Sequence, residues 1–234
     1  MDMTKNGLIA HETYFTVISQ RTLGSGFFDD ACKEFYLCRL LQCQSAFHVH
    51  LHAYLLMEQR ILLMFTPRTP FGFSAFTKFL SENYNDYYSI RFERRVQAWQ
   101  KSMSICLLPS FNLIQDCQKF IERFVIKMEV STHPGKYHYS SYCANAFSLR
   151  PKYLRRHQAI IELAHEDSCA LESYREFIET PFREEHERFL DSRLLHGHPL
   201  LGKRIRNRLE EERALTDIDK SGTIAPSRLR EGSD

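Results

Sequence analysis

The stretch Ala53–Pro67, which reads A-Y-L-L-M-E-Q-R-I-L-L-M-F-T-P, is the most informative part of the sequence about the fold. Two apolar runs, Leu51 to Met57 and Ile61 to Thr66, flank the polar pair Glu58-Gln59. Apolar runs of this length around so short a polar break predict two antiparallel strands joined by a tight turn. Pro67 ends the second strand because proline has no backbone N–H to donate to a sheet.

Strands and helices continue on both sides of this hairpin. Residues 14–20 (Y-F-T-V-I-S-Q) predict a strand, and a helix follows with Asp29 or Asp30 as its N-cap. The apolar positions of that helix recur at helical spacing at Ala31, Phe35, Cys38 and Leu41. After the hairpin, residues 73–92 predict a helix and residues 100–108 contain a short strand.

A second strongly patterned helix begins after Ser110, which is a good N-cap residue. Its apolar residues fall at i, i+3 and i+4 spacing, at Phe111, Ile114, Cys117, Phe120, Ile121, Phe124 and Val125. The element order is then strand, helix, strand, strand, helix, strand, helix. This order predicts an α+β fold, with helices packed on one antiparallel sheet.

The rest of the chain predicts helices and a tail. We expect a domain over residues 10–130, a loop and helical C-terminal region over residues 131–215, and a disordered tail over residues 216–234, which is polar and contains Gly, Ser and Pro. The expected C-terminal helices are 153–165, 168–178, 181–190 and 202–215.

The composition excludes several classes of protein. With 43% hydrophobic residues in 234, the chain can bury a sizeable core. Its formal net charge is only +2, so any nucleic-acid-binding surface must be local. The seven cysteines form no C-x-x-C pair and predict reduced, buried thiols. No signal sequence or membrane span is evident, so we expect a cytoplasmic protein without a membrane partner.

The hairpin sequence is similar to that of the HUH single-tyrosine transposases, whose family pattern reads roughly A-Y-x-L-M-P-N-H-x-H-L-L-x-x-P. Further segments resemble the REP-associated branch of that family, over about residues 10 to 215. They are Tyr14–Arg21, Phe27–Asp30, the spacing from Trp99 to Phe120, Tyr137–Tyr142 and His198–Gly202. The resemblance implies the ferredoxin-like, RRM-like fold of the HUH transposases.

The same resemblance implies that the catalytic groups are missing. Such enzymes need two histidines on one strand to hold a divalent metal, and a helix-borne tyrosine as the nucleophile. At those positions this chain has Arg60, Leu62 and Phe120. A guanidinium cannot be deprotonated and leucine has no lone pair, so we expect no catalytic residues and no cofactor. Magnesium or manganese is expected only if catalysis has been retained.

Three histidines with a period of two, His48, His50 and His52, are weak candidates for a relocated metal site. If Met57 pairs with Arg60, strand parity places all three on the sheet face opposite Arg60 and Leu62. A one-residue bulge would reverse that parity. The alternative is that they are ordinary polar residues entering a strand.

Replacement nucleophiles are also possible in principle. Tyr84, Tyr87 and Tyr88 fall at helical spacing, where aromatic residues usually belong to the core or its rim. The loop residues Tyr137, Tyr139 and Tyr142 either stack on bases or cover the sheet. Phe120 lies on the apolar stripe of its helix, so its lost hydroxyl agrees with burial.

Two groups of basic residues are candidates for DNA binding. The first is Lys203, Arg204, Arg206 and Arg208, ahead of three glutamates. The second is Arg155 and Arg156. Each group either contacts phosphate or forms a solvated helix face.

Three functions remain open. The first is a transposase-related DNA-binding protein that does not nick DNA, and its partner by resemblance is single-stranded or hairpin DNA. The second is an active, metal-dependent transposase or endonuclease with relocated catalytic residues. The third is a protein-interaction or regulatory module that has lost DNA binding. A homodimer is left open in each case.

Overall fold

The computed structural model describes residues 7–22, 26–27, 29–99, 103–147, 153–163 and 170–195. These residues all belong to one compact unit, which spans residues 1–200. The predicted helix over residues 202–215 and the predicted tail over residues 216–234 lie outside the described residues.

The centre of the fold is a four-stranded antiparallel sheet in the order β2-β3-β1-β4. Its strands are β1 (Tyr14–Ser19), β2 (Val49–Met57), β3 (Arg60–Pro67) and β4 (Ser104–Leu107). The predicted α+β fold with an antiparallel sheet is therefore confirmed. Each expected strand forms at its expected place in the chain.

The described helices follow the predicted order, with shorter segments toward the C-terminus. They are α1 (Asp30–Cys43), α2 (Gly72–Phe92), α3 (Phe111–Lys127), α4 (Tyr142–Ala146), α5 (Gln158–Glu162), α6 (Ala170–Glu179) and α7 (Glu184–Leu190), with the 3-10 turn η1 (Pro134–Lys136) and the π-helical turn η2 (Asp191–Leu195). Asp29 caps α1 by accepting a hydrogen bond from the Cys32 N–H, and Ser110 caps α3 through the Leu113 N–H. Both predicted N-caps are confirmed.

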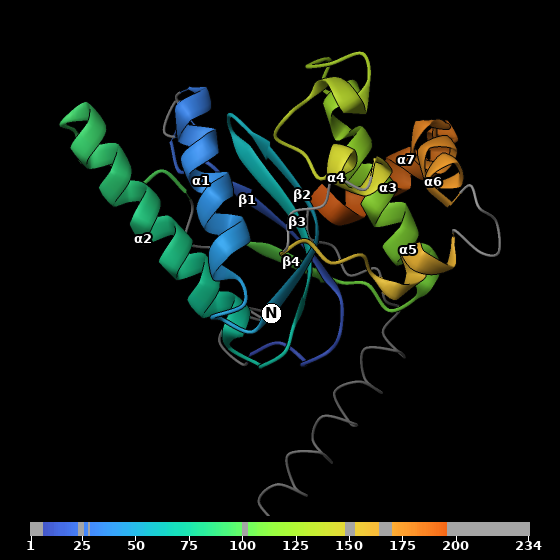
Figure 1. Ribbon diagram of the computed structural model, residues 1–234, viewed down its shortest axis with the longest axis horizontal. Coiled ribbons are helices and arrows are strands. Elements are labelled where there is room, and N and C mark those ends of the chain that lie inside the picture. The colour runs from blue at the N-terminus through green and yellow to red at the C-terminus, as the bar shows by residue number, and fades with distance from the viewer. Residues whose placement is uncertain are drawn as a thin grey trace, which may run out of the picture. The chain divides into compact units, whose positions relative to one another are not determined.

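Helices cover both faces of the sheet. Figure 1 shows α1 and α2 on one side, and α3 with α4 to α7 on the other. The odd-numbered residues of β1, Phe15 and Val17, pack in one apolar cluster with α3, whereas Tyr14 stacks on Phe65 on the opposite face. Because successive side chains of a strand point to opposite faces, each strand contributes residues to an apolar core on each side of the sheet.

The buried face of α1 differs from the predicted one. Its buried positions are Cys32, Lys33, Tyr36 and Leu40, and Ala31 and Cys38 are exposed. Phe35 is half-buried and stacks on Tyr87 of α2, with ring centroids 4.0 Å apart. Because α2 lies beside α1, the apolar surface of α1 is divided between the sheet and its neighbour. The expectation that the cysteines are buried is accordingly wrong for Cys38.

The outer edge of β2 is covered by the chain that follows α3. The Leu56 N–H donates to the carbonyl of Tyr139 at 2.9 Å, and the Ser141 N–H donates to the carbonyl of Tyr54 at 2.9 Å. Farther along the strand, the Arg155 N–H donates to the carbonyl of Leu51 at 3.0 Å. These bonds pair backbone N–H and carbonyl groups of β2 that have no partner strand on this side. The last of them also fixes the position of Arg155 beside the strand.

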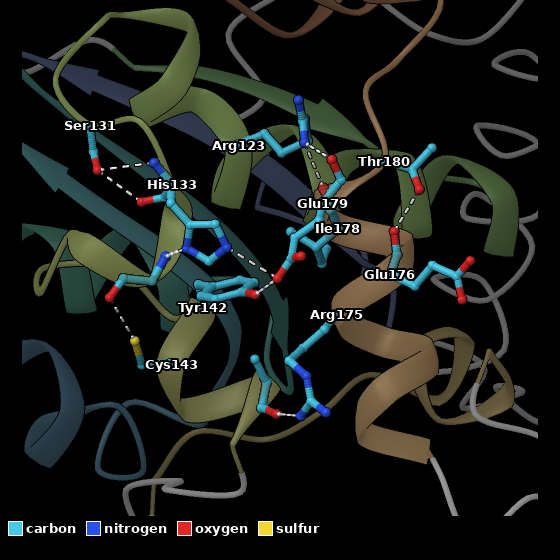
Figure 2. Close-up of polar contacts among 12 residues, drawn as sticks. Arg123, Ser131, His133, Tyr142, Cys143, Arg175, Glu176, Ile178, Glu179 and Thr180 are labelled. Carbon is cyan, nitrogen blue, oxygen red and sulfur yellow. Dashed lines mark hydrogen bonds and ion pairs between the residues drawn. The ribbon is translucent and has the colours of Figure 1, made fainter.

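Polar contacts tie α6 to the segment that contains η1 and α4 (Figure 2). Glu179 accepts a 2.6 Å hydrogen bond from the Tyr142 hydroxyl and lies 3.2 Å from Nε2 of His133. Arg123 of α3 donates to the carbonyls of Ile178 and Glu179 at the end of α6. A cation at a helix C-terminus satisfies carbonyls that lack a partner inside the helix.

Among the described helices, none has the length and hydropathy that would be needed to cross a membrane.

Candidate functional site

Leu62 and Arg60, at the positions that the resemblance assigns to metal ligands, lie on the α3 side of the sheet. Leu62 pairs with Leu55 of β2 and with Val17 of β1, and it has no exposed surface. Arg60 pairs with Met57 at the turn, as predicted. Its guanidinium lies over the ring of Phe124, 5.8 Å from the centroid. Neither side chain offers a lone pair toward this face.

Phe120, at the position that the resemblance assigns to the nucleophile, projects from α3 into the same apolar cluster as Leu62. Its side chain is 2% exposed and meets Phe15 edge to face, with centroids 6.3 Å apart. The structure therefore brings residues 62 and 120 into one core layer, although 57 residues of chain separate them. Dispersion and burial hold this layer together, and no polar chemistry is available in it.

The histidines of β2 lie on the other face from the one predicted. The pairing shifts by one residue between Leu51 and Ala53, so His52 occupies a β-bulge. His50 consequently pairs with Thr66, on the side of β3 that carries Leu62. The expectation that these histidines face away from Leu62 is wrong, because the bulge reverses the parity. His50 still lies about 13 Å along the sheet from Leu62, because its partner Thr66 is four residues from Leu62 at about 3.3 Å per residue.

His52 is part of a buried hydrogen-bonded chain. Its Nδ1 lies 2.8 Å from the carbonyl oxygen of Arg155, and its Nε2 lies 2.8 Å from the Thr66 hydroxyl. Thr66 in turn bonds Thr13, whose hydroxyl is 3.0 Å from Nε2 of His157. Burial lowers the pKa of His52 to about 3, so the ring is neutral. Both ring nitrogens are engaged within the protein, which leaves none to bind a metal.

Metal ligands do not gather anywhere in the part of the chain that the structure describes. Over these residues, no three His, Cys, Asp or Glu side chains are placed to hold one ion. Cys32, Cys106 and Cys117 are separately buried, and burial raises the pKa of Cys117.

A pocket of about 430 Å³ opens at the end of the hairpin farthest from the Glu58-Gln59 turn. It is lined by His48 and His50, by Arg68 just after β3, and by Tyr153 and Arg155. The predicted residues His48, His50 and Arg155 are thus brought together. The N-terminal His11 also lines this pocket.

The two predicted basic residues of the second group have different surroundings. Arg155 is exposed at the pocket. Arg156 is half-buried, donates to the carbonyl of Asn145, and lies over the ring of Tyr174 at 5.5 Å. Lys203, Arg204, Arg206 and Arg208 lie outside the described residues and remain predictions.

Of the tyrosines considered as replacement nucleophiles, Tyr84, Tyr88, Tyr139 and Tyr142 are buried, whereas Tyr87 and Tyr137 are half-buried. Tyr84 and Tyr142 have no exposed surface, and Tyr139 is 8% exposed. The hydroxyl of Tyr137 donates to the carbonyl of Leu56 at 2.7 Å. Burial raises the pKa of Tyr142, which makes its phenolate harder to form. These residues cover the sheet, and this arrangement favours the structural alternative over stacking on bases.

The sequence reading missed His11, Arg68 and Tyr153. Each belongs to a different segment, and no spacing connects them. The sequence therefore carries no signal that would have grouped them. In the folded backbone, His11 has a positive φ of 70°, as the predicted residue His48 does at 55°. Such conformations are uncommon outside glycine and concentrate at functional sites.

No protein-family model matches the chain, and no curated protein matches it either. Among solved structures, the chain is similar to a REP-associated tyrosine transposase bound to a REP hairpin, with a TM-score of 0.51 and 12% sequence identity. The match covers 64% of this chain and 88% of the other. At this identity the likeness shows the fold, which is that of an α+β protein with helices packed on an antiparallel sheet.

Proposed function

We propose that this chain is a transposase-related DNA-binding protein that does not cut DNA. The observation that carries the proposal is the shared burial of Leu62 and Phe120. By the resemblance, residues 62 and 120 stand where the transposases have a metal ligand and the nucleophile. Both side chains lie in one closed apolar cluster. The similar solved structure, a transposase bound to a hairpin, supports DNA as the partner.

The chemistry at these positions argues against cleavage. Transfer of a DNA end to the protein needs a hydroxyl that can become a nucleophile, and Phe120 has none. Polarisation of the scissile phosphate needs a metal, and the fixed positive charge of Arg60 would repel one. A rebuilt site elsewhere is not favoured by any cluster among the described side chains.

Binding requires less of the protein than cleavage does. Single-stranded and hairpin DNA can be held through backbone phosphates, shape and stacking. Because the formal net charge is only +2, phosphates would be contacted at local basic sites. The same near-neutral charge favours a second candidate function, a protein-interaction module that has given up DNA.

The test incubates the full chain with labelled hairpin DNA, with the matching single strand and with a duplex as the specificity control. We expect retention of the hairpin or single strand on a filter at low salt, and an affinity that falls as salt rises. With magnesium or manganese added, we expect neither a shortened strand nor a covalent protein–DNA adduct on a denaturing gel.

Each part of the proposal has its own contrary result. A metal-dependent cut, or an adduct, would establish the active enzyme with relocated residues. Absence of retention for every DNA, at all salt concentrations, would overturn the DNA-binding proposal and leave the protein-interaction module as the remaining candidate.

A further inference from the structure

The pocket beside β2 has an unusual balance of charge. Its ten lining residues include five with basic side chains and none with a carboxylate. The basic ones are His11, His48, His50, Arg68 and Arg155. In a protein with almost equal numbers of acidic and basic residues, this separation is local and pronounced. Within the described residues, neither Arg68 nor Arg155 forms an ion pair.

The backbone at the basic pocket residues is held by hydrogen bonds to the ends of β2 and β3. The Arg68 N–H donates to the carbonyl of His48 at 2.7 Å, and the His11 N–H donates to the carbonyl of Pro67 at 2.8 Å. The backbone of Arg155 is bonded on both sides, to the carbonyl of Leu51 and to Nδ1 of His52. Three separate segments are therefore tied to the ends of β2 and β3 before any ligand arrives, so little ordering is required on binding.

The side chains of the pocket suit a phosphate group. Two guanidiniums can each give paired, charge-assisted hydrogen bonds to phosphate oxygens. Burial and the charges of Arg155, Arg68 and His11 lower the pKa of His50, so this ring is held neutral beside the cations. A neutral imidazole can still donate one hydrogen bond. A metal ion would meet repulsion here, which makes an anion the appropriate ligand.

The size of the pocket suggests more than a bare anion. A space of about 430 Å³ lies within the range of small-molecule sites. Tyr153 and the imidazoles supply flat faces on which a base can stack. The chemical class indicated is a nucleotide, with its phosphate at the arginines.

We propose that the pocket lined by Arg68, Arg155 and His50 binds the phosphate of a nucleotide, as part of a DNA strand in preference to a free nucleotide. That the pocket binds a phosphate follows from its side chains alone. That the phosphate belongs to a DNA strand rests on the proposed DNA-binding function. The pocket lies at the far end of the hairpin from Arg60, so it holds DNA away from the former catalytic positions.

The first measurement uses the full chain without DNA. Inorganic phosphate, and then deoxythymidine monophosphate, is titrated while the histidine ring proton resonances are followed by NMR. We expect the resonances of His11, His48 and His50 to shift with both ligands. At the same low ligand concentration, the nucleotide should cause larger shifts than inorganic phosphate. His138 is the internal control: its side chain is 77% exposed, and it precedes Tyr139, whose carbonyl accepts from the Leu56 N–H near the turn end of β2. Absence of a shift at the pocket histidines would overturn the inference.

The second measurement uses the double variant Arg68→Ala/Arg155→Ala, and a matched double variant, Arg94→Ala/Arg95→Ala, that removes two exposed cations elsewhere. We expect the pocket variant to bind single-stranded DNA about tenfold more weakly at low salt, while the matched variant changes little. Arg68→Gln/Arg155→Gln keeps more of the side-chain volume and repeats the test if the alanine variant unfolds at a lower temperature.

The outcomes separate the two proposals. If the wild-type chain binds DNA and the pocket variant binds equally well, the pocket inference fails and the proposed function stands. If the wild-type chain binds no DNA but the nucleotide shifts the three histidines, the proposed function fails and the pocket is a site for free nucleotides.

Discussion

The Tyr174 hydroxyl donates a 2.6 Å hydrogen bond to Oε2 of Glu122, and both residues are buried where α6 packs on α3. The other carboxylate oxygen accepts bonds from Gln118, Ser141 and Asn145, at 2.9, 2.8 and 3.0 Å. One buried acid thereby joins α3 to α4, to α6 and to the segment that covers β2. Four donors are arranged around it. If the acid were removed, Tyr174, Ser141 and Asn145 would lose this acceptor, and Gln118 would keep only its 2.9 Å bond to the Tyr174 hydroxyl.

We expect Glu122→Ala to destabilise the protein severely. Each buried donor left without a partner costs about 1–3 kcal/mol, so the loss should reach about 3 kcal/mol or more. Glu122→Gln keeps an acceptor oxygen and should cost less. Urea unfolding at constant pH measures both variants. Equal stability of Glu122→Ala and the wild type would show that the donors find other partners.

Glu122 also predicts a dependence on pH. Burial raises the pKa of its carboxyl above the ordinary value of 4.5. A raised folded-state pKa means that the folded protein holds the proton more tightly, so stability falls as pH rises from 4.5 through the raised value. Glu122→Gln has no such proton. The stability difference between the wild type and this variant should therefore shift against the wild type with rising pH, and a constant difference would contradict the prediction.

His52 predicts the opposite dependence on pH. Its folded-state pKa is lowered to about 3 from the ordinary 6.5, because burial disfavours the charged ring. The unfolded chain therefore takes up the proton first as pH falls, and stability is lost between pH 6.5 and pH 3. The slope for one proton is at most about 1.4 kcal/mol per pH unit.

The variant His52→Gln should flatten this slope, and His138→Gln, at an exposed position, should leave it unchanged. Urea unfolding at several pH values between 4.5 and 7.5 makes the comparison. A slope that is equally steep in His52→Gln would assign the lost stability to other groups.

Placing a tyrosine at position 120 should not produce cleavage. In Phe120→Tyr the hydroxyl enters an apolar cluster, and burying it without a partner costs about 1–3 kcal/mol. Phe111→Tyr makes the same change on the same helix at a side chain that is 44% exposed, and it should cost almost nothing. Thermal unfolding gives the stabilities. Metal-dependent cutting of hairpin DNA by Phe120→Tyr would show that this position still reaches a working site.

The basic cluster Lys203, Arg204, Arg206 and Arg208 remains a prediction from the sequence. If it contacts phosphate, replacing all four residues by alanine should make the plot of log affinity against log salt shallower. The change should be about 0.7 for each phosphate contact that is lost on single-stranded DNA. The variant Arg94→Ala/Arg95→Ala again controls for charge. An unchanged slope would identify the cluster as a solvated helix face.

Features that depend on residues close together in the sequence were predicted correctly. The caps Asp29 and Ser110 are confirmed because a cap needs only its own side chain and a backbone N–H two or three residues later. The pairing of Leu55 with Leu62 is confirmed because a two-residue turn fixes the register on both sides of it. Both features depend on neighbours in the sequence, so the sequence contains the information.

Predictions that depend on distant neighbours were less accurate. The buried face of α1 is displaced toward Cys32 and Tyr36, because Tyr36 packs against Phe27 and Tyr84 from other elements. The bulge at His52 reversed the faces of the β2 histidines. Alternate residues point to opposite faces of the sheet only while the pairing is regular. A single extra residue in a bulge moves every residue beyond it to the other face.

The order of strands and helices and the hairpin register could be predicted from the sequence. The resemblance to the transposases added the prediction that Arg60, Leu62 and Phe120 stand where that family has its catalytic groups. The folded structure was needed to see that Leu62 and Phe120 share a core, that Glu122 joins four partners, and that Arg68 and Arg155 line one pocket. Helical or strand periodicity and helix capping depend on residues a few positions apart, whereas packing brings together segments that are far apart in the sequence. A site assembled from several segments therefore has no signature along the chain.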